Sequence, residues 1–156
     1  EALDNDHPEG QIIADLGCGS GILSLAALKL GAQSTFSVDT DSLAISATKI
    51  NSDLNNFSEN RLNVFLGSID ELEANMTEKK FDLIFCNILA PVIKSLGPSF
   101  ERIIGYKGKL ILSGLLVEQI KEIQEFFLSL GWKVIDIKTK DQWALMVLIL
   151  DLPGIK

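Results

Sequence analysis

The segment Ile12-Ile13-Ala14-Asp15-Leu16-Gly17-Cys18-Gly19-Ser20-Gly21 joins an apolar run to a turn with three glycines in five positions. The apolar residues before the turn predict a buried strand, and the apolar stretch from Ile22 to Leu30 after it predicts a helix. Because glycine has no Cβ, the backbone of such a turn can come close to a ligand. Unpaired N–H groups at the start of the helix would face the same ligand. This strand–turn–helix unit therefore predicts a site for a nucleotide-like cofactor.

Length and composition are those of one domain, residues 1–156, with ample apolar side chains for a core: 47% of the residues are apolar. The net charge of −7 argues against direct binding of nucleic acid, and no apolar run has the length of a membrane span. The two cysteines, Cys18 and Cys86, lack the spacing of a zinc site or of a disulfide framework. We therefore expect a reduced, cytoplasmic, monomeric protein without a metal.

Short β-rich runs alternate with helical patterns along the whole chain, which predicts an α/β fold with a parallel sheet and crossover helices. The expected strands are Gln11–Leu16, Ser34–Val38, Leu62–Leu66, Phe81–Cys86, Lys109–Leu112, Lys133–Lys138 and Trp143–Leu150. Only the residues Thr139 to Gln142 separate the last two strands, too few for a crossover helix, so these strands should form an antiparallel hairpin. The prediction is a mostly parallel seven-stranded sheet with a C-terminal antiparallel hairpin.

Two helices are predicted in detail. Asp41 or Ser42 should cap a helix that follows the second strand. The apolar residues at helical spacing that mark its expected packing side are Leu43, Ala47, Ile50 and Leu54. A second helix, starting at Ala90, should be interrupted at Gly97-Pro98 because proline lacks the N–H that the helix requires.

Candidate site residues are found by taking the carboxyl end of each strand, because ligands of open α/β sheets bind there. The first strand contributes Asp15 and the turn residues Gly17, Cys18, Gly19 and Gly21. Asp39 ends the second strand, where a carboxylate can accept both hydroxyls of a ribose. Ser68 follows the third strand, where it could touch an adenine edge, and Asn87 follows the fourth.

Several of these residues have a second interpretation. Asp15 serves either the ligand or the amides of the turn. Asp70, close to Ser68, is more often a helix cap than an adenine contact. Cys18 and Cys86 would act as small packing residues, and the only histidine, His7, would be solvated.

The acid-Leu-Gly-x-Gly-x-Gly spacing of residues 15–21 resembles the first motif of the S-adenosylmethionine-dependent methyltransferases. A dinucleotide fingerprint would instead place its third glycine at position 22, which is Ile22. Further segments make the resemblance more specific: Val38-Asp39-Thr40-Asp41, Asn87-Ile88-Leu89-Ala90, Leu112-Ser113-Gly114-Leu115-Leu116 and Asp141-Gln142-Trp143. With them the chain resembles, over essentially its whole length, the PrmA family, the methyltransferases of large-subunit ribosomal protein eleven.

The resemblance implies a Rossmann-like class I methyltransferase fold. It also implies an enzyme that transfers methyl groups from S-adenosylmethionine to lysine ε-amines and the N-terminal α-amine of a ribosomal protein, leaving S-adenosylhomocysteine. Carried over by position, Gly17 with its turn, Asp39 and Asn87 would bind the cofactor. Asn87 would also border the sulfonium and the incoming amine, and we expect its carbonyl oxygen to orient that amine.

The family also has an N-terminal substrate-recognition domain and a cofactor-contacting segment, both absent from this sequence. The chain is therefore expected to be the catalytic domain, whose ribosomal partner binds through the missing part, and residues 1–4 would be the remnant of a helix. Three alternatives stay open: a class I methyltransferase for another protein or a small molecule, a cofactor-binding domain without transfer activity, and a nicotinamide oxidoreductase. The glycine spacing and the terminal hairpin count against the last.

Overall fold

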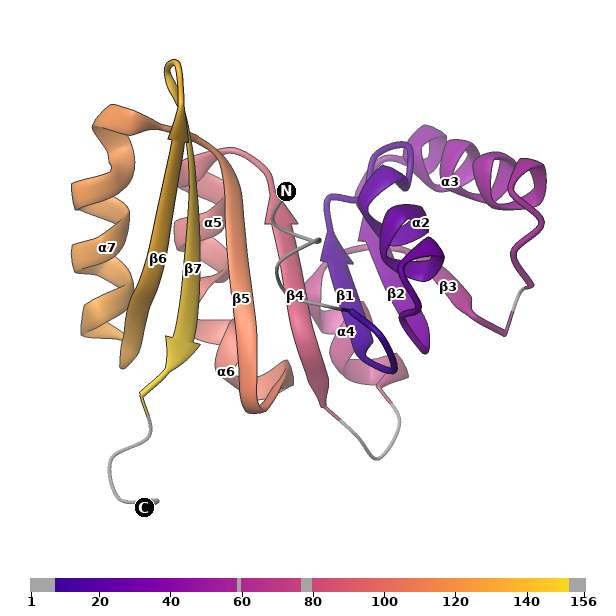
Figure 1. Ribbon diagram of the computed structural model, residues 1–156, viewed down its shortest axis with the longest axis horizontal. Helices are drawn as coiled ribbons and strands as arrows, with labels where there is room; N and C mark the ends of the chain where they lie inside the picture. The colour runs from indigo at the N-terminus through magenta and orange to yellow at the C-terminus, as the bar shows by residue number, and fades with distance from the viewer. Residues whose placement is uncertain (1–7, 59, 77–79, 152–156) are drawn as a thin grey trace.

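The computed structural model describes residues 8–58, 60–76 and 80–151. Within these segments, a seven-stranded sheet has the order β3-β2-β1-β4-β5-β7-β6 (Figure 1). The strands are β1 (Ile12–Leu16), β2 (Ser34–Asp39), β3 (Leu62–Leu66), β4 (Phe81–Asn87), β5 (Ile104–Leu116), β6 (Trp132–Lys140) and β7 (Trp143–Leu150). β1 to β5 pair in parallel, and β7 is antiparallel to both β5 and β6. The predicted α/β sheet with its terminal hairpin is confirmed, whereas residues 1–4 and His7 lie outside the described segments.

Helices cover both faces of the sheet (Figure 1). On one face lie α2 (Ile22–Lys29) and α3 (Ser42–Leu54). On the other face lie α4 (Ile69–Asn75), α5 (Ala90–Leu96), α6 (Phe100–Ile103) and α7 (Ile120–Ser129). The short 3₁₀ helix η1 (Gly97–Ser99) separates α5 from α6, as Gly97-Pro98 predicted, and η2 (Val117–Gln119) precedes α7. None of the helices in the described segments has the length and apolar character needed to cross a bilayer.

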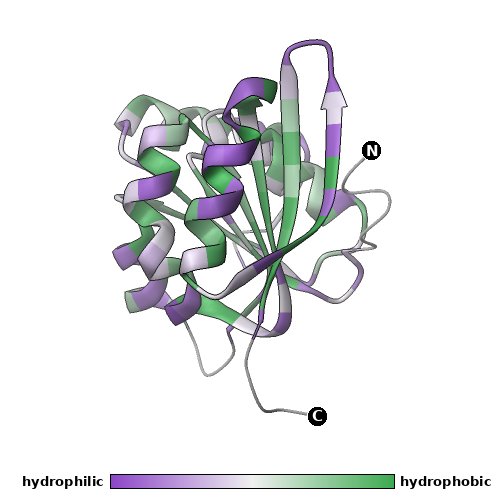
Figure 2. Cartoon of the chain, turned by 90° about the vertical axis from the view of Figure 1, so that its left-hand side faces the viewer, coloured by the Kyte–Doolittle hydropathy of each residue, from purple (hydrophilic) through white to green (hydrophobic). Residues whose placement is uncertain are grey.

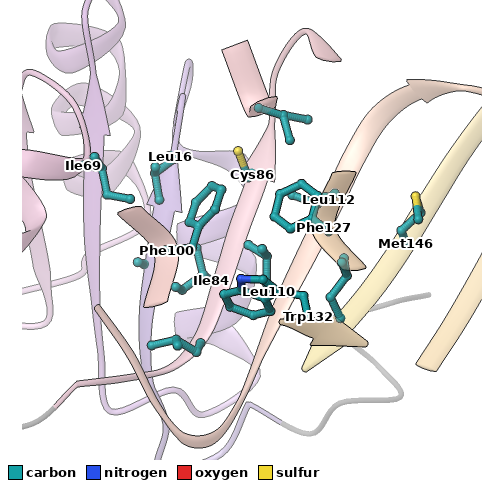
Figure 3. Packing of buried hydrophobic residues seen from close by; sticks show 14 of the residues in the cluster. Leu16, Ile69, Ile84, Cys86, Phe100, Leu110, Leu112, Phe127, Trp132 and Met146 are labelled. Carbon is teal, nitrogen blue, oxygen red and sulfur yellow. The ribbon is translucent and has the colours of Figure 1, made fainter. Parts of the chain in front are cut away.

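The core consists of two apolar clusters, one on each face of the sheet. The larger cluster lies between the sheet and helices α4 to α7 and includes Ile84, Leu110, Phe127 and Trp132 (Figure 3). Trp132 is 1% exposed, and its ring meets that of Phe127 edge-on at a centroid distance of 6.2 Å. Helix α7 turns its apolar residues to this cluster and its hydrophilic residues outward (Figure 2). β4 is covered on both faces, which explains its nearly continuous apolar sequence.

Helix α3 is oriented opposite to the sequence prediction. Leu43, Ile50 and Leu54 have exposed fractions of 75%, 58% and 74%, so the predicted packing stripe faces outward, and Ala47 is only half-buried. The prediction of the cap is confirmed: the Asp41 carboxylate accepts a hydrogen bond from Leu43 N at 2.8 Å.

The buried side of α3 consists of Ile45, Thr48 and Ser52. The Thr48 hydroxyl donates to the carbonyl oxygen of Gly19 at 3.0 Å, and the Asn51 side-chain amide donates to that of Ser20 at 2.8 Å. These two bonds tie α3 to the glycine turn. The helix therefore packs through a mixed polar face, and the side chains of that face satisfy two carbonyls of the turn.

Some element boundaries also differ from the prediction. β5 is longer than the predicted Lys109–Leu112 because its backbone finds partners at both ends: Phe81 pairs with Ile104, and Leu116 with Trp143. The bounds of α4 and α6 were not predicted, since seven and four residues are too short to show a clear helical period.

Candidate cofactor and acceptor site

The turns that follow β1, β2, β3 and β4 enclose a cavity of about 340 Å³ at the carboxyl edge of the sheet. Its wall brings together three of the predicted residues, Gly17, Asp39 and Ser68, from three different strand ends. Apolar side chains of the segment after β4, Ile88 and Leu89, form another part of the wall. A single carboxylate among apolar groups suits a ligand with a flat apolar part and a few hydroxyls.

The glycine turn needs glycine for two reasons: its backbone angles disfavour other residues, and neighbouring side chains leave no room for a Cβ. Gly17 and Gly21 have φ angles of 72° and 78°, in the left-handed region that disfavours residues with a Cβ. A Cβ on Gly17 would overlap the Ile88 side chain, and a Cβ on Gly21 would lie 2.8 Å from the Thr48 methyl carbon. Glycine here lets β1, α3 and the segment after β4 approach one another.

Most backbone amides of the turn are paired within the protein. Gly17 N and Cys18 N both donate to the carbonyl of Val38, at 2.9 and 3.1 Å, and Gly21 N donates to that of Cys18 at 2.8 Å. Gly19 N donates to the Asp39 carboxylate at 3.0 Å. The turn thus offers fewer unpaired N–H groups than the sequence suggested, and its main contribution is a closely approachable, rigid backbone.

Asp39 is half-buried in the wall of the 340 Å³ cavity. Its Oδ1 accepts from Asp41 N and its Oδ2 from Gly19 N, each at 3.0 Å. A carboxylate has about four acceptor sites, so roughly two remain for hydroxyl groups of a ligand. The two amides hold the carboxylate in one orientation toward the cavity, as a bidentate ribose contact requires.

Asp15 lies beneath the turn, 1% exposed, and does not line that cavity. Its Oδ2 accepts from Ser24 N at 3.2 Å and from Ser24 Oγ at 2.7 Å, which holds the first turn of α2. Its Oδ1 is buried and has no hydrogen-bond partner among the residues that the structure describes. Burial raises the pKa of Asp15 to about 6, although both bonds from Ser24 oppose the shift. The sequence predicted that Asp15 serves either the ligand or the backbone amides of the turn. Its observed contacts, both with Ser24, are structural.

The two cysteines are packing residues with neutral thiols. Burial raises the pKa of Cys18 to about 11, and its Sγ lies 3.5 Å from Thr48 Oγ1. Burial also raises the pKa of Cys86 above its usual range. Both thiols therefore stay protonated at neutral pH and are poor nucleophiles.

The segment after β3 places Ser68, but not Asp70, at the cavity. Ser68 occupies the position before the first residue of α4 and lines the wall. Asp70 lies inside the first turn of α4, so it is not the cap that the sequence suggested. It instead forms an exposed ion pair with Arg102 at 3.3 Å.

A second cavity, of about 510 Å³, adjoins Asn87 on the side of the β6–β7 hairpin. Besides Asn87, its wall includes Gly114 of β5, Lys138 of β6 and Trp143 of β7. Trp143 is 51% exposed. Of these residues only Asn87 was predicted for the site. The Asp141-Gln142-Trp143 segment was the available signal for the hairpin, since an exposed tryptophan beside a cavity is a common contact residue.

The two cavities meet at one dipeptide of the chain. Asn87 lines the 510 Å³ cavity, and the next residue, Ile88, lines the 340 Å³ cavity. A ligand in the first cavity and a second molecule in the other would therefore both contact the end of β4. This arrangement can support group transfer between two bound molecules without a nucleophile from the protein.

A Rossmann-like sheet with this strand order and a cavity at its carboxyl edge defines a domain of the class I methyltransferase type. A crystal structure of a methyltransferase from Pyrococcus furiosus has the same fold, with a TM-score of 0.76, 18% identity, and coverage of 94% of this chain and 77% of that chain. The crystal structure of ribosomal protein L11 methylase from Lactobacillus delbrueckii subsp. bulgaricus has a TM-score of 0.86 and 27% identity, covering 96% of this chain and 75% of that chain.

The family model described as ribosomal protein L11 methyltransferase (PrmA) matches residues 1–150, and the chain belongs to this family. A ribosomal protein L11 methyltransferase of Prochlorococcus marinus is 46% identical over 146 residues. One of Parasynechococcus marenigrum is 45% identical over 146 residues. The matches cover 94% of this chain but only 48% and 50% of these relatives, so the chain spans about half of their length.

Proposed function

We propose that the protein transfers methyl groups from S-adenosylmethionine to amines of ribosomal protein L11: lysine ε-amines and the N-terminal α-amine. The observation that carries the proposal is that Asn87 and the next residue, Ile88, line two different cavities, in a chain of this family. The relatives' names favour this activity over the alternatives of another acceptor or of a binding domain without transfer. The nicotinamide alternative lacks the third glycine of its fingerprint.

The residues of the 340 Å³ cavity fit S-adenosylmethionine. Asp39 would accept the ribose hydroxyls, Ile88 and Leu89 would cover the adenine, and Ser68 would lie at its edge. Gly17 allows the chain of the cofactor to pass close to the backbone.

When bound, S-adenosylmethionine supplies a methyl group on a sulfonium: an amine nitrogen forms the new C–N bond, and the electron pair of the broken C–S bond stays on sulfur. The acceptor must be neutral, and a lysine of pKa about 10.4 is neutral in only about one molecule in a thousand near pH 7.4, a cost of about 4 kcal/mol. Orientation of two reactants can contribute roughly 7–11 kcal/mol, which is enough to offset that cost. We assign this orienting role to the Asn87 carbonyl oxygen, which would accept a hydrogen bond from the amine; after transfer, the methylated ammonium nitrogen loses its proton to water.

We further propose that residues 1–156 act as the catalytic domain of a monomeric, cytoplasmic enzyme, and that a separate N-terminal domain recruits the ribosomal protein. The coverage of about half of each relative supports this division between a catalytic and a recruiting domain.

Transfer of labelled methyl groups to purified L11 by the full-length protein tests the activity. Label on another acceptor, or on none, would contradict the assigned substrate.

The cofactor assignment is tested by calorimetric titration with S-adenosylhomocysteine. Asp39→Ala should weaken binding by at least about tenfold, because each hydrogen bond to a carboxylate contributes roughly 1.5–3 kcal/mol. Asp53→Ala is the matched control: Asp53 is exposed on α3 and does not line the 340 Å³ cavity, so its loss should leave the affinity unchanged. Equal affinity of the two variants would refute the assignment of Asp39.

A further inference from the structure

No side-chain hydrogen bond among the described residues fixes the orientation of the Asn87 amide. Asn87 is exposed at the end of β4, and its side chain forms no hydrogen bond within the described segments. An amide without partners can rotate among several rotamers unless neighbouring atoms restrict it. The atoms next to its oxygen therefore decide where that oxygen lies.

Gly114 of β5 is the closest such neighbour. It follows Ser113, which pairs with Asn87 in the parallel register of β4 and β5. A Cβ on Gly114 would lie 2.6 Å from Asn87 Oδ1, closer than real Cβ contacts allow. Gly114 also has a φ of 74° and lies where the register between β5 and β7 shifts. The missing side chain thus leaves the space that the Asn87 oxygen occupies.

Gly17 lies next to Ile88, the second residue of the dipeptide Asn87-Ile88. A Cβ on Gly17 would overlap the Ile88 side chain, as noted above. Because β4 lies between β1 and β5 in the sheet, one glycine from each neighbouring strand end flanks the pair Asn87-Ile88. The two glycines therefore set the position of the dipeptide at which the cavities meet.

We propose that Gly114 is a positioning residue for methyl transfer: its lack of a side chain places Asn87 Oδ1 at the junction of the two cavities. The inference rests on the proposed function, since it assumes that Asn87 orients the acceptor amine. A Cβ at position 114 would displace that oxygen, and misplacement by about 1 Å can cost roughly 100-fold in rate. Gly114 does not line the 340 Å³ cavity, so cofactor binding should be spared.

The test compares four variants of the full-length protein with the wild type: Gly114→Ala, Asn87→Ala, the double variant and Gly131→Ala. Gly131 is the control, because its φ of 82° carries the same backbone strain while a Cβ there would meet nothing within 4 Å. Gly114→Ala should lower kcat on L11 by about 10- to 100-fold, with affinity for S-adenosylhomocysteine within about twofold of wild type. Gly131→Ala should leave both nearly unchanged.

The double variant shows whether Gly114 acts through Asn87. If it does, Gly114→Ala should have little further effect once Asn87 is alanine, because coupled residues are not additive. Losses that multiply, or a Gly114→Ala rate equal to that of Gly131→Ala, would overturn the inference.

A wild-type protein that methylates nothing would refute the proposed function instead. The positioning is then measured from the Asn87 side-chain amide signals in a ¹H–¹⁵N spectrum. Gly114→Ala should shift these signals and Gly131→Ala should not. Unshifted signals in Gly114→Ala would overturn the positioning role.

Discussion

Replacement of Asp15 by asparagine should remove the pH-dependent destabilisation of the folded state that the buried carboxylate causes. The pKa of Asp15 is raised from 3.8 to about 6, because burial disfavours the carboxylate more than the bonds from Ser24 favour it. The rise from 3.8 to about 6 corresponds to about 3 kcal/mol, since each tenfold change in proton affinity is roughly 1.36 kcal/mol. Asparagine has nearly the same shape, keeps an acceptor for Ser24 and cannot ionise.

The sign follows from which state binds more protons. Below about pH 4 the Asp15 carboxyl is protonated in both the folded and the unfolded chain, and it costs nothing. Between about pH 4 and 6 the unfolded chain ionises first, so the folded state holds more protons and the free energy of unfolding falls as pH rises. Above about pH 6 both states are ionised, and the full cost of about 3 kcal/mol remains.

Urea unfolding from pH 3.5 to 8 measures this effect. The stability of Asp15→Asn minus that of the wild type should increase by about 3 kcal/mol between pH 4 and pH 7, whatever constant offset the new amide introduces. Asp53→Asn, at an exposed position of α3, removes the same charge without burial, and its curve should run parallel to the wild type. If the stability curve of Asp15→Asn also ran parallel to that of the wild type, the argument that burial destabilises the ionised Asp15 carboxylate would be refuted.

Two further predictions concern packing. Trp132→Ala should lower the free energy of unfolding by about 3–5 kcal/mol, because it removes a fully buried ring that meets Phe127; a loss below about 1 kcal/mol in urea unfolding would contradict this. Leu54→Lys should change stability by less than about 0.5 kcal/mol, whereas Ile45→Lys, which buries a charge, should cost more than about 3 kcal/mol; the reverse order in thermal unfolding would mean that α3 packs through the other face.

The strand–turn–helix unit could be predicted because its signals are local. An apolar run, three closely spaced glycines and a second apolar run lie within residues 12–30, and the structure forms β1, the turn and α2 there. The bounds of β3 and β7 also match the prediction, since each is a short apolar run between polar or turn residues. Asp39, at the end of β2, was found because parallel strands end at one edge of the sheet.

The orientation of α3 could not be predicted in the same way. Its sequence shows an apolar stripe, and periodicity alone favours burying that stripe. The structure buries the face that carries Thr48, whose hydroxyl meets Gly19, 29 residues away in the sequence. A hydrogen bond to a carbonyl of a distant turn leaves no periodic signal in the helix that makes it.

Local sequence signals were enough to establish the succession of the strands, the turn that needs glycine and the carboxylate that ends β2, because hydrophobic period and backbone strain act over a few residues. The packing of distant segments was needed to bring Asn87, Gly114 and Trp143 to one cavity and to place Asp15 beneath the turn rather than in the cofactor cavity. These arrangements depend on which strands pair and where β5 shifts register. Pairing between distant segments is a property of the packed sheet, and no single segment carries it.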